Sequence, residues 1–392
     1  MRNIPLAKPE ITHSDIQGVV RVLKTFSLTR GPVADRFEKK IADYIGVRYA
    51  IATNSGTSAL HLAVRALGIG EGDIVITTPM SFIASSNAIL FERAVPVFVD
   101  IEPHTLTIDT RLVEKRIRAL RRKGKRVKAI LAIDLFGNMA NWRRLREIAR
   151  TYKLALIEDS CEALGSYYRS RRGEKMAGSL GDVAVFGFYP NKTLTTGEGG
   201  MLVTNDKKIA ENARSMRNQG IVKGKAWGEY DKLGYNYHLA DINCALGLSQ
   251  LKRMPSIIKK RRFIASEYTR MFAKRGLVRT PVIQNNFFVN PFVYVIHLPR
   301  KYDIRHRDRL LKLLEKSGIK ARPYFPAIHL TAFYKREFGY KRGDFPVTEF
   351  FADRALAIPF YHSLSRADIA NIVKSVNFCV QKLASLSTGG RV

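Results

Sequence analysis

Cysteine and long apolar runs are scarce in this sequence. Its 392 residues include three cysteines, Cys161, Cys244 and Cys379, which lie far apart in the chain. An odd number of widely spaced cysteines argues against a disulfide framework or a CxxC metal site and is typical of reduced thiols. No run approaches the ~18 consecutive apolar residues of a membrane helix, and the N-terminus has no apolar signal core. We therefore expect a cytoplasmic protein without a membrane segment.

Acidic residues are also few. The 34 Asp and Glu residues face 66 Lys and Arg residues, which leaves a formal net charge of +32. Such an excess of positive charge can bind a nucleic acid, an anionic membrane surface or an anionic substrate, but the sequence has no zinc-finger or RNA-binding signature. In the basic run 114–128, Ile117 and Leu120 have helical spacing, which predicts an amphipathic helix with a basic outer face. We interpret the charge as a solvated surface with incidental affinity for polyanions.

Short apolar runs alternate with helical patterns between about residues 50 and 206. In one helical pattern, 57–67, apolar side chains recur at Leu60, Ala63, Val64 and Leu67. Near-continuous apolar strands separated by helices predict an α/β fold, with a mostly parallel sheet between two helical layers. The predicted strands cover residues 49–53, 73–78, 95–101, 127–137, 154–159, 182–188 and 200–205.

The pattern changes after about residue 253. A long helix is predicted over 255–276, followed by a strand over 287–299 and by helices near 305–317 and 366–384. We therefore expect two domains, a large three-layer α/β/α domain at 1–253 and a smaller α+β domain at 254–392.

Four candidate features of a binding site follow the predicted strands. Gly56 and Thr57 begin a helix, where exposed backbone N–H groups suit a phosphate, although such segments are also ordinary helix caps. Phe82 offers a ring for stacking, Asp159 ends an apolar strand, and Lys192 lies in a glycine-rich turn. Ligands bind at the carboxyl ends of parallel strands, so we expect these residues to share one site. Pyridoxal phosphate needs this set, because its aldehyde reacts with a lysine and its ring nitrogen needs a carboxylate.

The sequence resembles the DegT/DnrJ/StrS type of sugar aminotransferase, which are pyridoxal-phosphate enzymes of the aspartate-aminotransferase fold. The likeness covers nearly the whole chain. The segments that carry it are "GPVADRFEKKIADYIGVRYAIATNSGTSALHLA" (31–63), "PMSFIASSNAI" (79–89), "EDSCEALGS" (158–166), "FYPNKTLTTGEGGMLVTND" (188–206), "LGYNYHLADINCALGLSQL" (233–251), "ARPYFPAIHL" (321–330) and "FPVTEFFADRALAIPFY" (345–361).

The resemblance implies a role for each candidate residue. Lys192 binds the cofactor covalently and moves protons, Asp159 pairs with the pyridine nitrogen, and Phe82 stacks on the ring. Gly56 and Thr57 bind the phosphate. A second group of implied contacts comprises Asn236, donated to the phosphate by the neighbouring subunit of a homodimer with shared sites, and His329 and Tyr334, which line the sugar-nucleotide pocket.

Three positions depart from the family pattern. Gly187 replaces a serine five residues before the lysine, which removes one phosphate hydroxyl contact. Glu162 stands where a glutamine or histidine often meets the phenolic side of the cofactor, so its carboxylate must be protonated or paired. His238 replaces the usual arginine after "YNY" (235–237), which weakens any charge pairing expected there.

The function implied is transfer of an amino group, with glutamate as donor, to a keto-hexose linked to a nucleoside diphosphate. The segment 192–201 is most similar to members that aminate carbon 4 of the sugar, and the products belong to amino-sugar and polysaccharide biosynthesis. Two alternatives stay open. One is an inactive cofactor-fold protein that regulates by binding nucleic acid, and the other is the dehydratase branch, in which a histidine replaces the lysine. The intact pair of Lys192 and Asp159 argues against the regulator, and Lys192 argues against the dehydratase.

Overall fold

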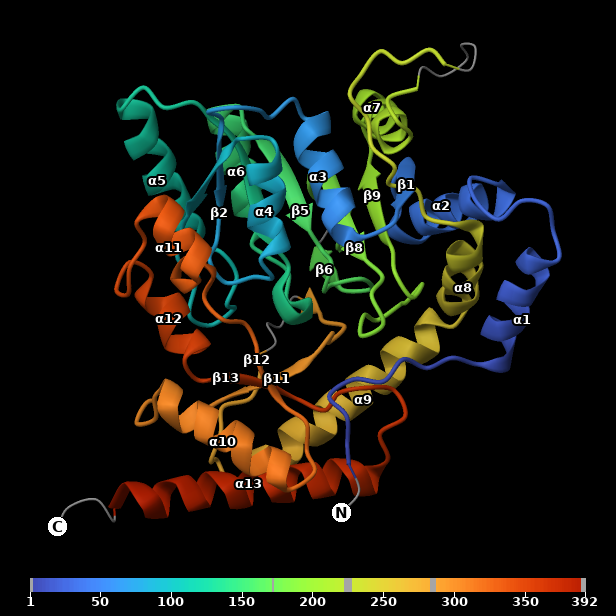
Figure 1. Cartoon of the computed structure of the whole chain (residues 1–392). Helices are drawn as coiled ribbons and strands as arrows, with labels where there is room; N and C mark the ends of the chain where they lie inside the picture. The colour runs from blue at the N-terminus through green and yellow to red at the C-terminus, as the bar shows by residue number, and fades with distance from the viewer. Residues whose placement is uncertain (1–2, 171–172, 222–227, 283–286, 389–392) are drawn as a thin grey trace.

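The computed structural model describes residues 3–170, 173–221, 228–282 and 287–388 (Figure 1). Its centre is a seven-stranded sheet with the strand order β1-β9-β8-β5-β4-β2-β3. Strand β9 pairs antiparallel with both β1 and β8, and the other pairings are parallel. The strands are β1 (Tyr49–Thr53), β2 (Ile74–Thr77), β3 (Val95–Phe98), β4 (Val127–Ile133), β5 (Ala155–Asp159), β8 (Val183–Gly187) and β9 (Gly200–Thr204).

Helices cover both faces of this sheet, as the apolar strands predict. In β4, Leu131 and Ile133 belong to the core on one face, whereas Ile130 and Ala132 belong to the core on the other face. The first face packs against α3 (Gly56–Ala66), α4 (Ala84–Phe91) and α7 (Lys207–Arg217). The second face packs against α2 (Pro32–Ile45), α5 (Thr110–Arg122), α6 (Trp142–Tyr152) and α8 (Asp241–Lys252). The predicted three-layer α/β/α arrangement is confirmed.

The basic run of the sequence forms an amphipathic helix. In α5, Ile117 is fully buried and Leu120 is partly buried against the sheet, whereas the neighbouring basic residues are mostly exposed. The three cysteines are unpaired, as their spacing predicts. Among the residues that the structure describes, no helix is both long and apolar enough to cross a membrane.

A smaller antiparallel sheet lies below the large one in Figure 1, with the order β11-β13-β12. Its strands are β11 (Tyr294–His297), β12 (Arg322–Pro323) and β13 (Ala355–Ile358). One face of this sheet shares a core with α9 (Met254–Ala273), α10 (Ile304–Lys316) and α13 (Arg366–Thr388). The single strand predicted over 287–299 is divided into β11 and a short strand β10 (Phe287–Phe288), which pairs with β6 (Tyr167–Ser170); β6 in turn pairs with β7 (Gly173–Met176).

Two segments cross the predicted domain boundary at residue 253. Near the N-terminus, Ile4 is buried in the core of the small sheet and its helices. In the C-terminal part, Tyr334 and Phe345 pack against Phe98 at the end of β3. These residues belong to or adjoin α11 (Ala332–Phe338) and α12 (Pro346–Ala352), which lie below α5 in Figure 1. The division into residues 1–253 and 254–392 stays a prediction, and the described packing joins its two parts.

Candidate active site

The turn that carries Lys192 is held between β8 and β9. Phe188 N–H donates to Gly199 O at 2.8 Å, and Lys192 N–H donates to Tyr189 O at 2.9 Å. A Cβ on Gly200 would lie 2.3 Å from Ser55 O, so only glycine permits this approach to the start of α3. The glycines that follow Lys192 thus bring its turn against the segment predicted to bind phosphate.

The amine of Lys192 faces into the site, away from bulk solvent. Its side chain is 17% exposed, and Nζ lies 3.6 Å from Glu162 Oε1. The same nitrogen lies 4.0 Å from the centre of the Phe292 ring. A carboxylate on one side and an aromatic ring on the other therefore fix where this amine points.

Asp159 ends β5 at the carboxyl edge of the sheet and is 5% exposed. Its Oδ2 accepts a hydrogen bond from Ser85 Oγ at 2.7 Å, and its Oδ1 accepts one from Cys161 N–H at 3.2 Å. Ser85 belongs to α4, and its hydroxyl also contacts Phe82 O at 3.3 Å. These bonds hold the aspartate in a single orientation and place the Phe82 loop beside it.

The first turn of α3 has the features of an anion site. Ser55 caps the helix by accepting from Ser58 N–H at 3.1 Å, and Ser55 O accepts from Ala59 N–H. Within the described part of the chain, the N–H groups of Gly56 and Thr57 have no acceptor. A Cβ built on Gly56 would lie 3.2 Å from Gly187 Cα. The backbones of Gly56 and Gly187 therefore approach each other closely at the position where the family often has a serine. The two free N–H groups are suited to a phosphate.

Phe82 is 60% exposed, which is unusual for a phenylalanine beside a buried aspartate. Its ring centre lies 6.3 Å from that of Phe325. Phe325 also lies within ring-contact distance of Phe136, at 6.0 Å. The exposed ring is therefore free to stack on a flat ligand, and the aromatic residues behind it form a wall.

Glu162, the second departure from the family pattern, is paired. Besides the contact with Lys192, its Oε2 accepts a hydrogen bond from Phe136 N–H at 3.0 Å. Burial raises the pKa of the Glu162 carboxyl above its ordinary value, and the charge of Lys192 acts in the opposite direction.

The raised pKa of Glu162 predicts a pH-dependent stability. A carboxyl with a raised pKa in the folded state loses its stabilising contribution as the pH rises through that pKa. In the cofactor-free protein, Glu162→Gln should therefore gain stability relative to the original chain as the pH rises from about 4.5. Urea midpoints measured from pH 5 to 8 check this, with the exposed Glu71→Gln as the control. Parallel curves for the two variants would show that burial of Glu162 has no such effect.

Asn236 and His238 lie on a segment that contacts the start of the α3 site. The side chain of Asn236 is exposed, and its backbone O accepts from Asn54 Nδ2 at 3.3 Å. Tyr235 and Tyr237, on either side of it, are stacked with ring centres 4.8 Å apart. Burial, followed by the charges of nearby arginines, lowers the pKa of His238 to about 4. His238 is therefore neutral at pH 7 and does not replace the charge of an arginine.

His329 and Tyr334 are fully buried in this structure. His329 Nε2 lies 3.0 Å from Glu349 Oε1, and Tyr334 donates from its hydroxyl to Asn87 Oδ1 at 3.0 Å. Neither side chain is exposed to contact a sugar nucleotide. Their expected role in lining the sugar-nucleotide pocket stays a prediction, and the burial seen here does not favour it. In the structure the two side chains attach the segment that follows Phe325 to its neighbours, because His329 contacts Glu349 in α12 and Tyr334 contacts Asn87 in α4.

The structure brings together Gly56, Thr57, Phe82, Asp159, Glu162 and Lys192, and it adds residues that sequence reasoning missed. Ser85 lies in the segment 79–89 that carries the family resemblance, but no sequence pattern pointed to this serine itself. Phe292 was assigned to a continuous strand, and only the break between β10 and β11 frees it to face Lys192.

Comparisons with known proteins agree with this geometry. The sequence matches the DegT/DnrJ/EryC1/StrS aminotransferase family over residues 9–377. GDP-perosamine synthase of Caulobacter vibrioides is 34% identical over 376 residues, which cover 95% of this chain and 97% of that protein. UDP-4-amino-4,6-dideoxy-N-acetyl-beta-L-altrosamine transaminase of Campylobacter jejuni is 35% identical over 379 residues, covering 96% and 97%.

A solved structure extends the comparison to the fold and the cofactor. The PLP-form of Spr1654 from Streptococcus pneumoniae matches with a TM-score of 0.89 at 26% identity, covering 97% of this chain and 99% of that one. Together with the family match, this shows that the chain belongs to the DegT/DnrJ/EryC1/StrS aminotransferase family and is an aminotransferase that uses pyridoxal phosphate.

Proposed function

We propose that this aminotransferase moves the amino group of glutamate to carbon 4 of a keto-hexose linked to a nucleoside diphosphate. The observation that carries the proposal is the lysine amine at one sheet edge, between Glu162 and the Phe292 ring and close to the Gly56–Gly187 contact. Both relatives are named for nucleotide-linked sugars, and one name places the amino group on carbon 4. These names support the substrate class and the position of amination.

The residues of the site fit pyridoxal phosphate. The free N–H groups of Gly56 and Thr57 would hold its phosphate, the Asp159 carboxylate would face its ring nitrogen, and Phe82 would cover its ring. When bound, this group supplies an electron sink and carries the amino group between the two substrates. Asp159 would keep the ring nitrogen protonated, which that electron sink requires.

Lys192 performs the proton transfers. A lysine near the reacting carbon acts as a general base when its amine is free and as a general acid when it is protonated. Glu162 orients the amine, since Nζ lies 3.6 Å from its Oε1. The low exposure of Lys192 limits contact of the amine with water during the transfer.

The two rival functions differ from this proposal at Lys192. In the dehydratase branch a histidine takes the place of this lysine, and here the amine is present and directed into the site. A regulator that only bound nucleic acid would have no need of a buried aspartate and an oriented amine at one edge. Salt-dependent binding of nucleic acid without any transaminase activity would favour the regulator.

The donor half of the reaction tests the proposal. Glutamate added to the protein with pyridoxal phosphate should bleach the yellow absorption band and release one 2-oxoglutarate for each site. Alanine and aspartate are the comparison donors, because they lack the length of the glutamate side chain. Bleaching by either of these at a rate equal to that with glutamate would contradict glutamate as the donor.

Asn236 offers a test of the proposed homodimer. If each site takes Lys192 from one subunit and Asn236 from the other, a dimer of one Lys192→Ala chain and one Asn236→Ala chain has one intact site and one site that lacks both residues. Co-expression in equal amounts should then restore about a quarter of the original activity, because half of the dimers contain one intact site. Each variant expressed alone is the control. Since Asn236 also lies beside Asn54 of its own chain, an inactive mixture would mean that it serves its own site.

A further inference from the structure

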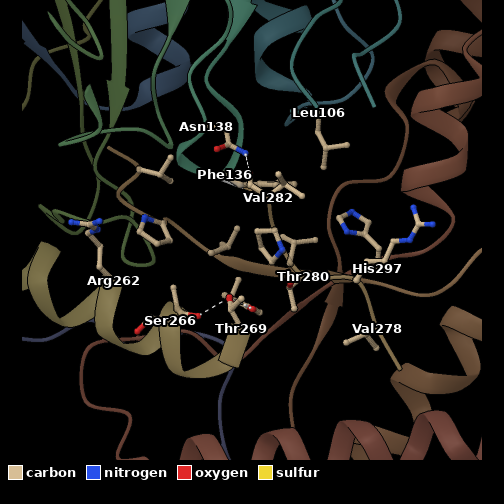
Figure 2. A pocket seen from close by; sticks show the side chains of 18 of the residues that line it. Leu106, Phe136, Asn138, Arg262, Ser266, Thr269, Val278, Thr280, Val282 and His297 are labelled. Carbon is tan, nitrogen blue, oxygen red and sulfur yellow. Dashed lines mark hydrogen bonds between the residues drawn. The ribbon is translucent and has the colours of Figure 1, made fainter. Parts of the chain in front are cut away.

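A second cavity lies between the large sheet and the small one, with a volume of about 1000 Å³. Figure 2 shows its wall, which α9 and β11 form together with residues near 104–106 and 136–138. The cavity surface is mostly apolar, and its lining residues include Leu106, Val278, Val282, Val289 and Val293. A cavity of this size accommodates a small-molecule ligand.

The charge around this cavity has one sign. The described residues that line it include Lys259, Arg262, Arg270 and Arg279, and none of them is an aspartate or glutamate. Arg270 is paired with Glu267 outside the cavity lining. Among the described residues, no carboxylate forms an ion pair with the other three cations, and the Arg262 guanidinium lies 3.9 Å from the centre of the Phe288 ring. An apolar interior beneath unpaired cations is complementary to an amphipathic anion.

A buried polar group also lacks a partner at this cavity. His297 is 6% exposed and lines the cavity, and its Nε2 has no hydrogen-bond partner in the part of the chain that the structure describes. Its backbone pairs with that of Arg279, at 2.8 and 2.9 Å, which sets the histidine beside an unpaired cation. Figure 2 shows His297 and Arg262 at opposite sides of the view. An unpartnered buried nitrogen is costly unless a ligand satisfies it.

This cavity is separate from the Lys192 site, although the two share a wall. Phe292 faces Lys192, and Asn290 donates to Leu164 O at 2.7 Å on the same side. The alternating residues Pro291, Val293 and Val295 line the second cavity. Neighbouring side chains of one extended segment thus face two different sites.

We propose that this cavity is a second binding site, which takes an amphipathic phosphate with an aliphatic body. The body occupies the valine-rich interior, and the phosphate binds the Arg279 guanidinium and His297 Nε2 at one end of the cavity. The hydroxyl groups of Ser266 and Thr269 in the same lining donate to the backbone O of Phe263 and Ala265, so they are not donors to the ligand. An arginine beside an unpartnered imidazole nitrogen suits a phosphate, which carries more charge and more acceptor oxygens than a carboxylate.

Calorimetry with the full chain carrying its cofactor tests this site, with octyl phosphate as the probe. Octyl phosphate should bind at one site per chain, whereas octanol and inorganic phosphate should each bind at least ~10-fold more weakly. Glutamate should not compete with it, because the Lys192 site is separate. Absence of octyl phosphate binding, or tighter binding of a nucleoside diphosphate in its place, would overturn the proposal.

Two variants locate the binding. Val293→Trp fills the cavity and Arg279→Gln removes the cation beside His297, and each should weaken the binding of octyl phosphate by ~10-fold or more. Lys312→Gln changes an exposed cation on α10 outside the cavity and should bind like the original chain. Melting curves identify any variant that fails to fold, and Arg279→Gln, at an exposed side chain, keeps the test valid if Val293→Trp does not fold. Unchanged affinity in both folded variants would place the ligand elsewhere.

Discussion

Lys192→Ala is expected to lower the rate of amino transfer by roughly 10⁴-fold or more. The substitution removes both the covalent attachment of pyridoxal phosphate and the group that moves protons. Among the described residues, the groups in contact with the amine include the Glu162 carboxylate and the Phe292 ring, and neither can form a covalent bond with the cofactor aldehyde in its place. The loss should appear in kcat, and single-turnover measurements with glutamate check it.

Lys192→Arg is the matched control for this variant. It keeps a positive charge between Glu162 and Phe292, but a guanidinium stays protonated and cannot attack the cofactor aldehyde. Lys192→Arg should therefore retain the fold and be as inactive as the alanine variant. An arginine variant with more than about a tenth of the original rate would show that charge, and not the amine, is what the reaction needs.

Asp159→Asn is expected to lower the rate by roughly 10²- to 10⁴-fold. The amide has the shape of the carboxylate, so it can still accept from Cys161 N–H and can donate to Ser85 Oγ. What disappears is the negative charge that would keep the cofactor ring nitrogen protonated. The folded structure and cofactor binding should persist, and the visible spectrum together with single-turnover rates separates binding from chemistry.

Ser85→Ala separates the charge of Asp159 from its orientation. This variant removes the 2.7 Å hydrogen bond to Oδ2 and leaves the carboxylate charged. We expect a loss of about 10-fold or less, since one orienting contact remains at Cys161 N–H. Equal losses in Asp159→Asn and Ser85→Ala would mean that orientation, rather than charge, makes Asp159 important.

The sheet could be predicted well because its strands are buried on both faces. The run at 49–53 coincides with β1, and that at 154–159 differs from β5 by one residue. The run at 127–137 extends past β4, which ends at Ile133, because the apolar Leu135 begins a short helical turn there. Apolar character alone does not distinguish the end of a strand from a buried turn.

The small sheet was harder to predict from the sequence. Residues 287–299 are apolar throughout, yet Asn290 and Pro291 interrupt the run, and their side chains face opposite sites. Which face of such a segment meets the cofactor and which meets a second cavity depends on the packing of two sheets that are distant in sequence. The local sequence pattern does not determine that packing, so neither the position of Phe292 beside Lys192 nor the cavity could be predicted.

The site was predictable where a residue directly follows a strand. Asp159 and Lys192 follow or flank strands of the parallel sheet, so topology alone places them at one edge. His329 and Tyr334 lie in a segment whose orientation depends on contacts with Glu349 and Asn87. Their burial follows from tertiary packing, which resemblance to a family does not determine for a particular chain.

The most direct test of this account follows the nitrogen atom itself. The purified protein with pyridoxal phosphate would be incubated with isotopically labelled glutamate and with 4-keto and 3-keto forms of a nucleoside-diphosphate hexose. Mass spectrometry should find the labelled nitrogen in an amino sugar that is still linked to its nucleotide, and only from the 4-keto substrate. Labelled nitrogen that enters neither sugar, although glutamate bleaches the cofactor, would contradict the account.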